Sequence, residues 1–144
     1  MKVLVVTGRL AQDLVRRSAC GADVLVLDLD IAAFITPEML MSSAPKGYDL
    51  ILVPGAITSD FSKVEKALDT KIRLGPKHAA DLGFVLTHLD EIELSQSIPA
   101  CVLFEERMKR EAKSALKKLE SESTQDLMIK GLKIGGNSRM KVLA

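Results

Sequence analysis

An unbroken aliphatic run at the start of the chain constrains its fold more than any other feature. Residues 3–6 are all branched aliphatics, and such a run predicts a strand buried on both faces, as strands in the middle of a parallel sheet are. Apolar stretches at residues 22–29 and 48–53 are interpreted as two further strands, and Lys71-Ile72-Arg73-Leu74 as a fourth, shorter strand. We therefore expect an α/β fold, a three-layer sandwich with a mostly parallel sheet, flavodoxin-like or Rossmann-like in strand order.

Apolar residues recur at helical spacing between the expected strands. The clearest local signal is Thr36-Pro37, an N-cap threonine followed by a proline at the first helical position, which predicts a helix as far as about Ser43. The longest helix is expected from Pro99 to about Ser121. The remaining helices are expected at residues 10–20, 61–68 and 79–94, and two short apolar segments follow at residues 127–129 and 132–136.

The composition argues against several classes of protein. The formal net charge is +1 and the pI is about 7.8, which gives no electrostatic reason to expect nucleic acid or an acidic membrane as a partner. Cys20 and Cys101 lack the spacing of a metal site and fit reduced thiols of the cytoplasm. The first apolar run is broken by Arg9, so it is neither a signal peptide nor a membrane span. We expect a cytoplasmic protein.

The 144 residues are enough for one domain with a real core. We expect an α/β accessory domain at residues 1–122, followed at residues 123–144 by a linker and the start of another domain. Residues 139–144 read as the opening of a strand with nothing after it. A domain rarely stops on an unfinished apolar run, so we expect the natural polypeptide to continue beyond Ala144.

The first candidate site residues follow the first strand. In an open α/β sheet the ligand site forms beyond the carboxyl ends of the central strands, which is where Thr7, Gly8 and Arg9 stand. Glycine lets the backbone turn or approach a ligand, and arginine can clamp phosphate or carboxylate through two hydrogen bonds. The alternative is that Gly8 only turns the chain and that Arg9 is solvated.

The loops after the third and fourth strands supply the other candidates. Lys77 is a second anion ligand if all strands are parallel, because it then lies at the same edge of the sheet as Arg9. The glycine loops would donate backbone N–H groups to a phosphate, and an aspartate would orient a hydroxyl or an N–H group. Together with Lys77, the candidates from these loops are Gly55, Asp60, Gly75 and His78.

Asp28 with Asp30, and separately His88, are further polar residues that a site could use. Asp28 and Asp30 would point to one side if their strand persisted, as a ribose-binding or metal-binding pair could, but acids that cap a strand in water are commoner. His88 falls within an expected helix, where a structural role is the simpler reading. We therefore expect no metal site in this chain.

No catalytic signature accompanies these residues. The sequence holds no dinucleotide-binding glycine motif, P-loop, nucleophile elbow, cobalamin signature or zinc-protease motif. No serine or cysteine has a recognisable base beside it. The residues by themselves indicate an anion pocket without naming a reaction or a catalytic residue.

Four short segments nevertheless occur in an order and spacing that indicate a family. They are Val6-Thr7-Gly8-Arg9-Leu10-Ala11, Ile31-Ala32-Ala33-Phe34-Ile35-Thr36-Pro37-Glu38, Leu52-Val53-Pro54-Gly55 with Asp60, and Leu74-Gly75-Pro76-Lys77 with Asp81-Leu82. Over most of residues 2–82 the chain thus resembles the N-terminal region of the archaeal dihydropteroate synthase-related proteins, which have counterparts in methylotrophic bacteria. The tail, residues 135–144, looks like the junction into that family's pterin-binding barrel.

The resemblance implies tetrahydromethanopterin-type cofactor biosynthesis, in which a dihydropterin pyrophosphate is joined to an arylamine that carries a ribose phosphate. This segment lacks the Asn-x-Thr-x-Asp-Ser-Phe loop of a true dihydropteroate synthase and the barrel strands after the first. We therefore expect the segment not to be catalytic alone and to hold no cofactor. The pterin substrate belongs to the adjoining domain of the full-length protein, a pterin-dependent transferase.

Two roles remain open for the segment. In the first it is an accessory domain whose strand-edge pocket binds a phosphate-bearing substrate of methanopterin- or folate-type biosynthesis. In the second it is a non-catalytic docking or dimerisation module, whose long helix packs against its own C-terminal barrel domain or against a second subunit as a homodimer.

Overall fold

The computed structural model of the chain describes residues 1–140. Two compact units divide at Phe104 and Glu105, so that the first unit is Met1–Phe104. The domain boundary expected after residue 122 stays a prediction, because the division at Glu105 concerns compactness alone. The strand expected to open within residues 139–144 falls largely on residues 141–144, which lie outside the described residues.

A four-stranded, all-parallel sheet organises the first unit. Its order is β2-β1-β3-β4, with the first strand in the interior. Val5 of β1 lies opposite Val24 of β2 and Leu52 of β3. This order confirms the expected α/β fold with a flavodoxin-like or Rossmann-like sheet. The strands are β1 (Val3–Thr7), β2 (Asp23–Val26), β3 (Leu50–Val53) and β4 (Lys71–Leu74).

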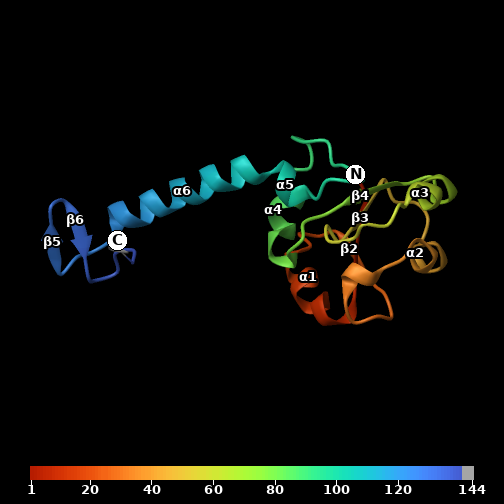
Figure 1. Cartoon of the computed structure of the whole chain (residues 1–144), viewed down its shortest axis with the longest axis horizontal. Coiled ribbons are helices and arrows are strands. Elements are labelled where there is room, and N and C mark those ends of the chain that lie inside the picture. The colour runs from red at the N-terminus through yellow and green to blue at the C-terminus, as the bar shows by residue number, and fades with distance from the viewer. Residues whose placement is uncertain (141–144) are drawn as a thin grey trace. The chain divides into compact units, whose positions relative to one another are not determined.

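Helices cover both faces of the sheet, which gives the three expected layers. Figure 1 shows α1 (Gln12–Ser18) and α4 (Leu82–Thr87) on one side of the sheet and α2 (Pro37–Ser43) and α3 (Ser62–Leu68) on the other. The short helix α5 (Ala100–Leu103) ends the unit. Single turns of 3-10 helix complete the loops: η1 (Arg9–Ala11), η2 (Ala32–Phe34) and η3 (Ala79–Asp81).

The strand residues alternate between two apolar layers. On the side of α2 and α3, the buried residues Leu4, Val6 and Ile51 belong to one continuous core with Leu40 and Val64 of these helices. On the side of α1 and α4, Val5 and Leu52 are buried, as are Val15, Leu82 and Val85 of the helices. A side chain of this size stabilises the fold by about 1.5–3 kcal/mol when it is fully buried. The first strand is therefore buried on both faces, as its sequence predicts.

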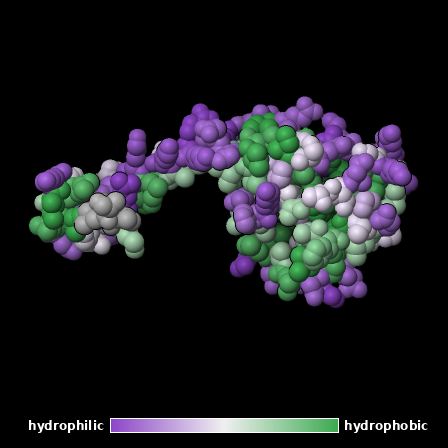
Figure 2. Space-filling model, viewed as in Figure 1, coloured by the Kyte–Doolittle hydropathy of each residue, from purple (hydrophilic) through white to green (hydrophobic). Residues whose placement is uncertain are grey.

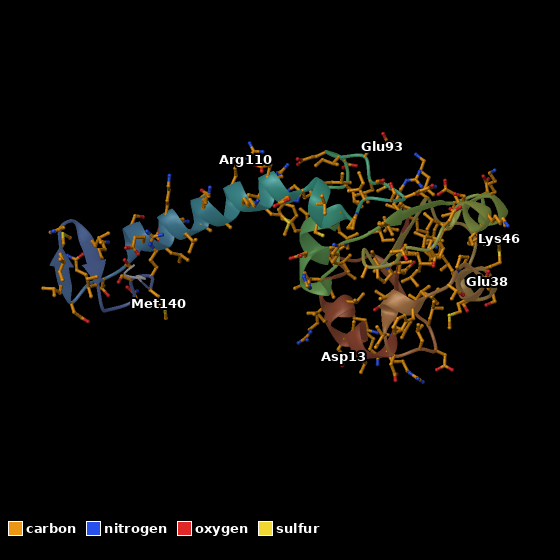
Figure 3. The ribbon with its side chains drawn as sticks, viewed as in Figure 1. Asp13, Glu38, Lys46, Glu93, Arg110 and Met140 are labelled. Atoms are coloured by element: carbon orange, nitrogen blue, oxygen red, sulfur yellow. The ribbon has the colours of Figure 1, made fainter. Side chains whose placement is uncertain are left out.

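The expected N-cap of α2 is confirmed. The Thr36 hydroxyl accepts a hydrogen bond from the backbone N–H of Met39 at 3.3 Å, and Pro37 occupies the first turn. Glu38, labelled in Figure 3, lies in the same turn. Hydrogen bonds from its own backbone and from Thr36 hold the pKa of its carboxyl below the ordinary value.

Strand β4 is an edge strand whose outer hydrogen-bonding groups are occupied. The Leu74 N–H donates to the Ser95 carbonyl at 2.9 Å, and the Ile72 N–H donates to the Glu65 carboxylate at 2.8 Å. Further along, the Ala100 N–H donates to the Gly75 carbonyl at 3.0 Å. The chain that follows α4 thus runs back along this edge, which protects it from pairing with another strand.

This return of the chain along β4 explains why the helices predicted at residues 79–94 and from Pro99 were too long. The helix expected at residues 79–94 stops at Thr87, because the next residues must turn for Leu94 to be buried and for Ser95 to reach β4. The long helix expected from Pro99 is interrupted at Phe104, which has no exposed surface and packs edge-to-face against Phe84 with ring centroids 5.6 Å apart. The predicted second strand was also too long: the sequence predicted a strand as far as residue 29, whereas β2 ends at Val26.

His88 supports the fold, in keeping with its expected structural role. Its Nδ1 lies 2.8 Å from the Phe84 carbonyl oxygen, and its ring lies 4.4 Å from the Phe84 ring and 6.4 Å from the Phe104 ring between centroids.

The second unit consists of a long helix and a β-hairpin. Helix α6 (Glu105–Glu122) contains no buried residue, and the two strands β5 (Leu127–Ile129) and β6 (Leu132–Ile134) pair antiparallel. The turn between the strands is Lys130-Gly131, and both residues have positive φ, of 48° and 80°. Such a two-residue turn matches the twist of a hairpin.

Lys133 of β6 donates hydrogen bonds to backbone carbonyl groups at the C-terminal end of α6. Its ammonium group donates to the carbonyl oxygens of Glu120 and Ser123 at 2.9 Å each and of Ser121 at 3.3 Å. The last carbonyls of a helix have no partner within the helix and carry partial negative charge, so a cation there is stabilising.

We expect Lys133→Met to weaken the last turn of α6 by about 1 kcal/mol, because the ammonium is lost while the aliphatic stem remains. Hydrogen exchange of the backbone amides in this turn measures the effect and should be about fivefold faster in the variant. Lys117→Met, in the body of the same helix, is the control and should leave the exchange rates unchanged. Equal protection of the last turn in both variants would contradict the capping role.

No helix within residues 1–140 is both long and apolar enough to cross a membrane.

Candidate functional site

A small pocket opens at the carboxyl edge of the sheet, where β1, β3 and β4 end. Its volume is about 120 Å³, and aliphatic residues form most of its wall. It lies on the face of the sheet that carries α1 and α4. The sheet contributes Val5, Thr7 and Leu52, and the helical segments contribute Ala11, Val15 and Leu82.

Three of the predicted site residues line this pocket, namely Thr7, Gly75 and Lys77. The prediction that the loops after β1 and β4 meet at one edge of a parallel sheet is therefore realised in the geometry. The other predicted residues lie outside the pocket wall: Gly8, Arg9, Gly55, Asp60 and His78.

Arg9 is held by two carboxylates. Its Nη1 donates to Asp28 at 2.7 Å and its Nε donates to Asp30 at 3.0 Å. The strand ends before the two aspartates, and the loop that follows it folds back onto η1. The pair considered for ribose or metal thus forms exposed ion pairs with the arginine, so Arg9 is not the free cation that the sequence suggested.

Gly8 allows the loop after β1 to pack against the loop after β2. A Cβ atom on Gly8 would lie 2.8 Å from the carbonyl oxygens of both Leu29 and Asp30. The N–H groups of Arg9 and Leu10 donate to these same carbonyls, at 2.8 and 3.2 Å. The N–H groups that follow Gly8 are therefore used within the protein.

Gly55 and Gly75 join the loops after β3 and β4 in a similar way. The Gly55 N–H donates to the Pro76 carbonyl at 3.1 Å, and the Gly75 N–H donates to the Val53 carbonyl at 2.7 Å. The N–H groups of the two glycines are therefore used between the neighbouring loops, which satisfy each other's backbone groups. That these loops donate other backbone N–H groups to a phosphate stays a prediction.

Asp60 and His78 are local turn residues. The Asp60 carboxylate accepts hydrogen bonds from the hydroxyl and the backbone N–H of Ser62, which lower its pKa. These bonds fix the turn that leads into α3, whose first residue is Ser62. His78 is exposed and precedes η3 without a side-chain hydrogen bond to that turn.

Thr7 is the buried polar group of the pocket. Only 2% of it is exposed, and its hydroxyl donates to the neighbouring Gly8 carbonyl across 3.4 Å, a long bond. The hydroxyl oxygen keeps two lone pairs for another donor.

Lys77 carries the positive charge of the pocket. It is exposed, and within residues 1–140 its ammonium forms no ion pair or side-chain hydrogen bond. The buried Thr7 and the exposed Lys77 therefore place a polar group deep in the pocket and a cation at its rim.

A larger, open depression of about 770 Å³ lies at the opposite edge of the sheet, near the start of β3 and β4. Its central charged groups, Glu65 and Arg73, are paired with each other at 2.7 Å and brace the edge strand. Among the described residues no group of acidic, histidine or cysteine side chains could hold a metal ion.

Two features of the structure were not predicted from the sequence: the alanines that line the pocket and the hydrogen bonds of Glu65. Ala11, Ala32 and Ala79 line the pocket and leave it open because they are small. Their signal was present, since each belongs to a short helical turn beyond a strand end. Glu65 gave no signal, because its partners Ile72, Arg73 and Gln96 all lie outside its own helix, in β4 and in the chain that returns along it.

The fold and the pocket together define a class: an α/β domain with a small, mostly apolar pocket, a buried hydroxyl and an exposed cation at the carboxyl edge of a parallel sheet. No family model and no solved structure matches the chain. An uncharacterized protein of Methanocaldococcus jannaschii is 30% identical to it over 159 aligned positions, which cover 99% of this chain and 30% of that relative. The chain thus spans about 30% of the length of the relative that it matches.

Proposed function

We propose that this chain is an accessory N-terminal domain of a dihydropteroate synthase-related protein, and that its strand-edge pocket binds a phosphate-bearing substrate of methanopterin- or folate-type biosynthesis. The observation that carries the proposal is the ammonium of Lys77, which has no ion pair or side-chain hydrogen bond within residues 1–140 and lies beside a preformed pocket. The order of the segments shared with that family supports it, as does a relative from an archaeon. A pterin-dependent transferase activity of the full-length protein and a cytoplasmic location are parts of the same proposal.

The pairing of Arg9 with two aspartates changes which of the two cations, Arg9 or Lys77, is expected to attract a phosphate. Since Asp28 and Asp30 occupy Arg9, Lys77 supplies most of the attraction for a phosphate. A single exposed cation binds an anion weakly, and salt screens the interaction.

Titration of the chain with inorganic phosphate at low salt, followed by backbone amide chemical shifts, tests the proposal. We expect saturable shifts at Thr7 and Gly75, weakened at least fivefold by Lys77→Gln and by raised salt. Lys46→Gln, which removes an exposed charge before the start of β3, is the matched control and should change the affinity less than twofold, because the pocket lies at the carboxyl ends of the strands. The absence of saturable shifts, or equal loss in both variants, would contradict the proposed site.

A docking module for the adjoining barrel domain, or a homodimer, is the second candidate, and the second unit favours it. Leu127, Ile129 and Leu132 are each about half exposed, at 55, 50 and 46%. These three side chains share one face of the hairpin, the face opposite Lys133. Figure 2 shows apolar surface over this hairpin. A two-stranded hairpin is only marginally stable unless such a face is covered.

The mass of the chain in solution discriminates a homodimer from the first role. A concentration-dependent dimer in which α6 is protected from amide exchange favours dimerisation, and a monomer with exchanging α6 amides leaves the barrel as the docking partner.

A further inference from the structure

Helix α6 carries an apolar stripe that is largely uncovered within residues 1–140. The stripe consists of Met108, Ala112, Ala115 and Leu119, whose spacing places them on one face of the helix. Every residue from 109 to 119 is exposed, and Leu119 is 64% exposed. A helix in water gains most of its stability from packing such a face, so α6 requires a partner.

The stripe is short and is bounded by charge. Its heptad pattern continues to Glu105 on one side and to Glu122 on the other, where acidic side chains stand in the apolar positions. The two alanines at its centre are small and allow a second helix to approach closely. The stripe therefore fits a partner helix of its own length.

The charged residues along one edge of the stripe form a symmetric pattern. Glu111 and Lys118 lie at equal distances along the sequence from the midpoint between Ser114 and Ala115. A second copy of the helix, rotated by half a turn about an axis through this midpoint, runs antiparallel to the first. Glu111 then faces Lys118 of the partner subunit, and the reciprocal contact forms by symmetry.

The other edge of the stripe follows the same pattern. Lys109 and Glu120 lie at equal distances from the same midpoint and have opposite charges. A parallel pair of helices would instead bring Glu111 beside Leu116 of the partner subunit, and the charges would not be matched. The charges at both edges thus select a second copy of this chain in the antiparallel orientation.

Glu111 and Lys118 are both accessible to a partner. The Glu111 carboxylate pairs with Arg107 of the same helix at 2.9 Å, and its side chain is still 49% exposed. A carboxylate can accept several hydrogen bonds, so it can bind a second cation. Lys118 is exposed, and within residues 1–140 its ammonium forms no ion pair or side-chain hydrogen bond.

We propose that α6 binds α6 of a second copy of this chain in the antiparallel orientation, with the apolar stripes in contact and Glu111 paired with Lys118 of the partner subunit. Met108 then packs against Leu119 of the partner subunit, and the alanines meet at the two-fold axis. This inference rests on the second proposed function, the docking module, and names its partner. Because the stripe is short, the expected Kd of the dimer is roughly 10–100 μM.

Sedimentation equilibrium of the full chain, from about 5 to 500 μM, tests the proposal. We expect a monomer–dimer equilibrium that raised salt weakens severalfold. Glu111→Lys and Lys118→Glu should each weaken the dimer about tenfold, because each change creates two like-charged pairs. Lys117→Glu, the same change on the opposite side of the helix from the stripe, is the matched control and should alter the Kd less than twofold.

The two charge-reversed variants should rescue each other. In a mixture of Glu111→Lys and Lys118→Glu chains, opposite charges face each other again at both contacts of the heterodimer. We therefore expect the mixture to dimerise with about the wild-type affinity, and the double variant to do so by itself. Circular dichroism of each variant checks that α6 remains helical.

The outcomes separate this inference from the proposed functions. A helical chain that stays monomeric up to about 500 μM refutes the α6 dimer, and the barrel domain then stays the candidate docking partner. A dimer that the charge reversals leave unchanged, or that mixing does not restore, also refutes it. None of these variants alters Lys77, so the phosphate titration tests the strand-edge pocket independently.

Discussion

Replacing Gly55 by alanine is expected to lower the free energy of unfolding by about 3 kcal/mol. A Cβ atom at this position would collide with the Gly75 carbonyl oxygen and would lie 2.9 Å from the Pro76 carbonyl carbon. Both are backbone atoms, so the clash cannot be relieved by turning a flexible side chain. The loops after β3 and β4 would have to separate, and their mutual hydrogen bonds from Gly55 and Gly75 would be lost.

Chemical denaturation of the variant measures this loss. Gly83→Ala is the control, because a Cβ atom in α4 would meet its nearest neighbours, Ser18 and Cys20, at ordinary distances of 3.4 and 3.5 Å. That variant should be unchanged or more stable by up to about 1 kcal/mol, since alanine favours a helix more than glycine does. A Gly55→Ala protein as stable as the Gly83→Ala protein would show that the loops do not pack as described.

Removing the carboxylate of Glu65 is expected to have an effect of similar size. Its Oε2 accepts hydrogen bonds from the Ile72 N–H at 2.8 Å, the Arg73 guanidinium at 2.7 Å and the Gln96 amide at 2.9 Å. Arg73 is only 17% exposed, so Glu65→Ala leaves a largely buried charge without its partner. We expect a loss of about 3 kcal/mol in the free energy of unfolding.

The same group makes the stability depend on pH. Burial raises the pKa of Glu65, but the hydrogen bonds from Ile72, Gln96 and Arg73 outweigh burial and hold the pKa below its ordinary value. A carboxyl whose pKa is lower in the folded than in the unfolded chain stabilises the fold above its unfolded pKa. This stabilisation is lost as the pH falls through its folded pKa.

We therefore expect the difference in stability between the wild type and Glu65→Gln to be largest near neutral pH and to shrink on acidification. Denaturation at a series of pH values measures it. Glu93→Gln changes an exposed carboxylate in the turn before Leu94 (Figure 3) and should shift the stability by less than about 0.5 kcal/mol at each pH. A constant difference for Glu65→Gln across the series would exclude the ionised carboxylate as the cause.

Local sequence signals predicted the elements whose structure depends on a few neighbouring residues. The aliphatic run at residues 3–6 predicted an interior strand, because only a strand covered on both faces can bury consecutive aliphatics. The cap at Thr36 predicted the start of α2, because the hydrogen bond joins residues three apart. The lengths of α4 and of the helix after Pro99 were not predictable in this way, because burial of Leu94 and Phe104 by distant parts of the chain ends them.

The candidate site likewise has one part that local sequence signals predicted and one part that depends on residues far apart in the chain. That Thr7, Gly75 and Lys77 meet follows from the parallel sheet, since the carboxyl ends of parallel strands share one edge. That Arg9 forms ion pairs does not follow from the sequence, because its partner Asp30 is 21 residues away and the loop between them folds back only in the assembled structure. The same holds for Glu65, whose partner Gln96 is 31 residues away.

The sequence by itself thus determined that the chain forms a parallel α/β sheet and which loops gather at its carboxyl edge, because strand burial and capping are properties of short segments. The tertiary structure alone decided that Arg9 pairs with Asp28 and Asp30, and that the pocket lined by Lys77 is small and mostly apolar. Pairing of charges and the closure of a cavity depend on distances between residues far apart in the chain, and only the folded chain fixes those distances.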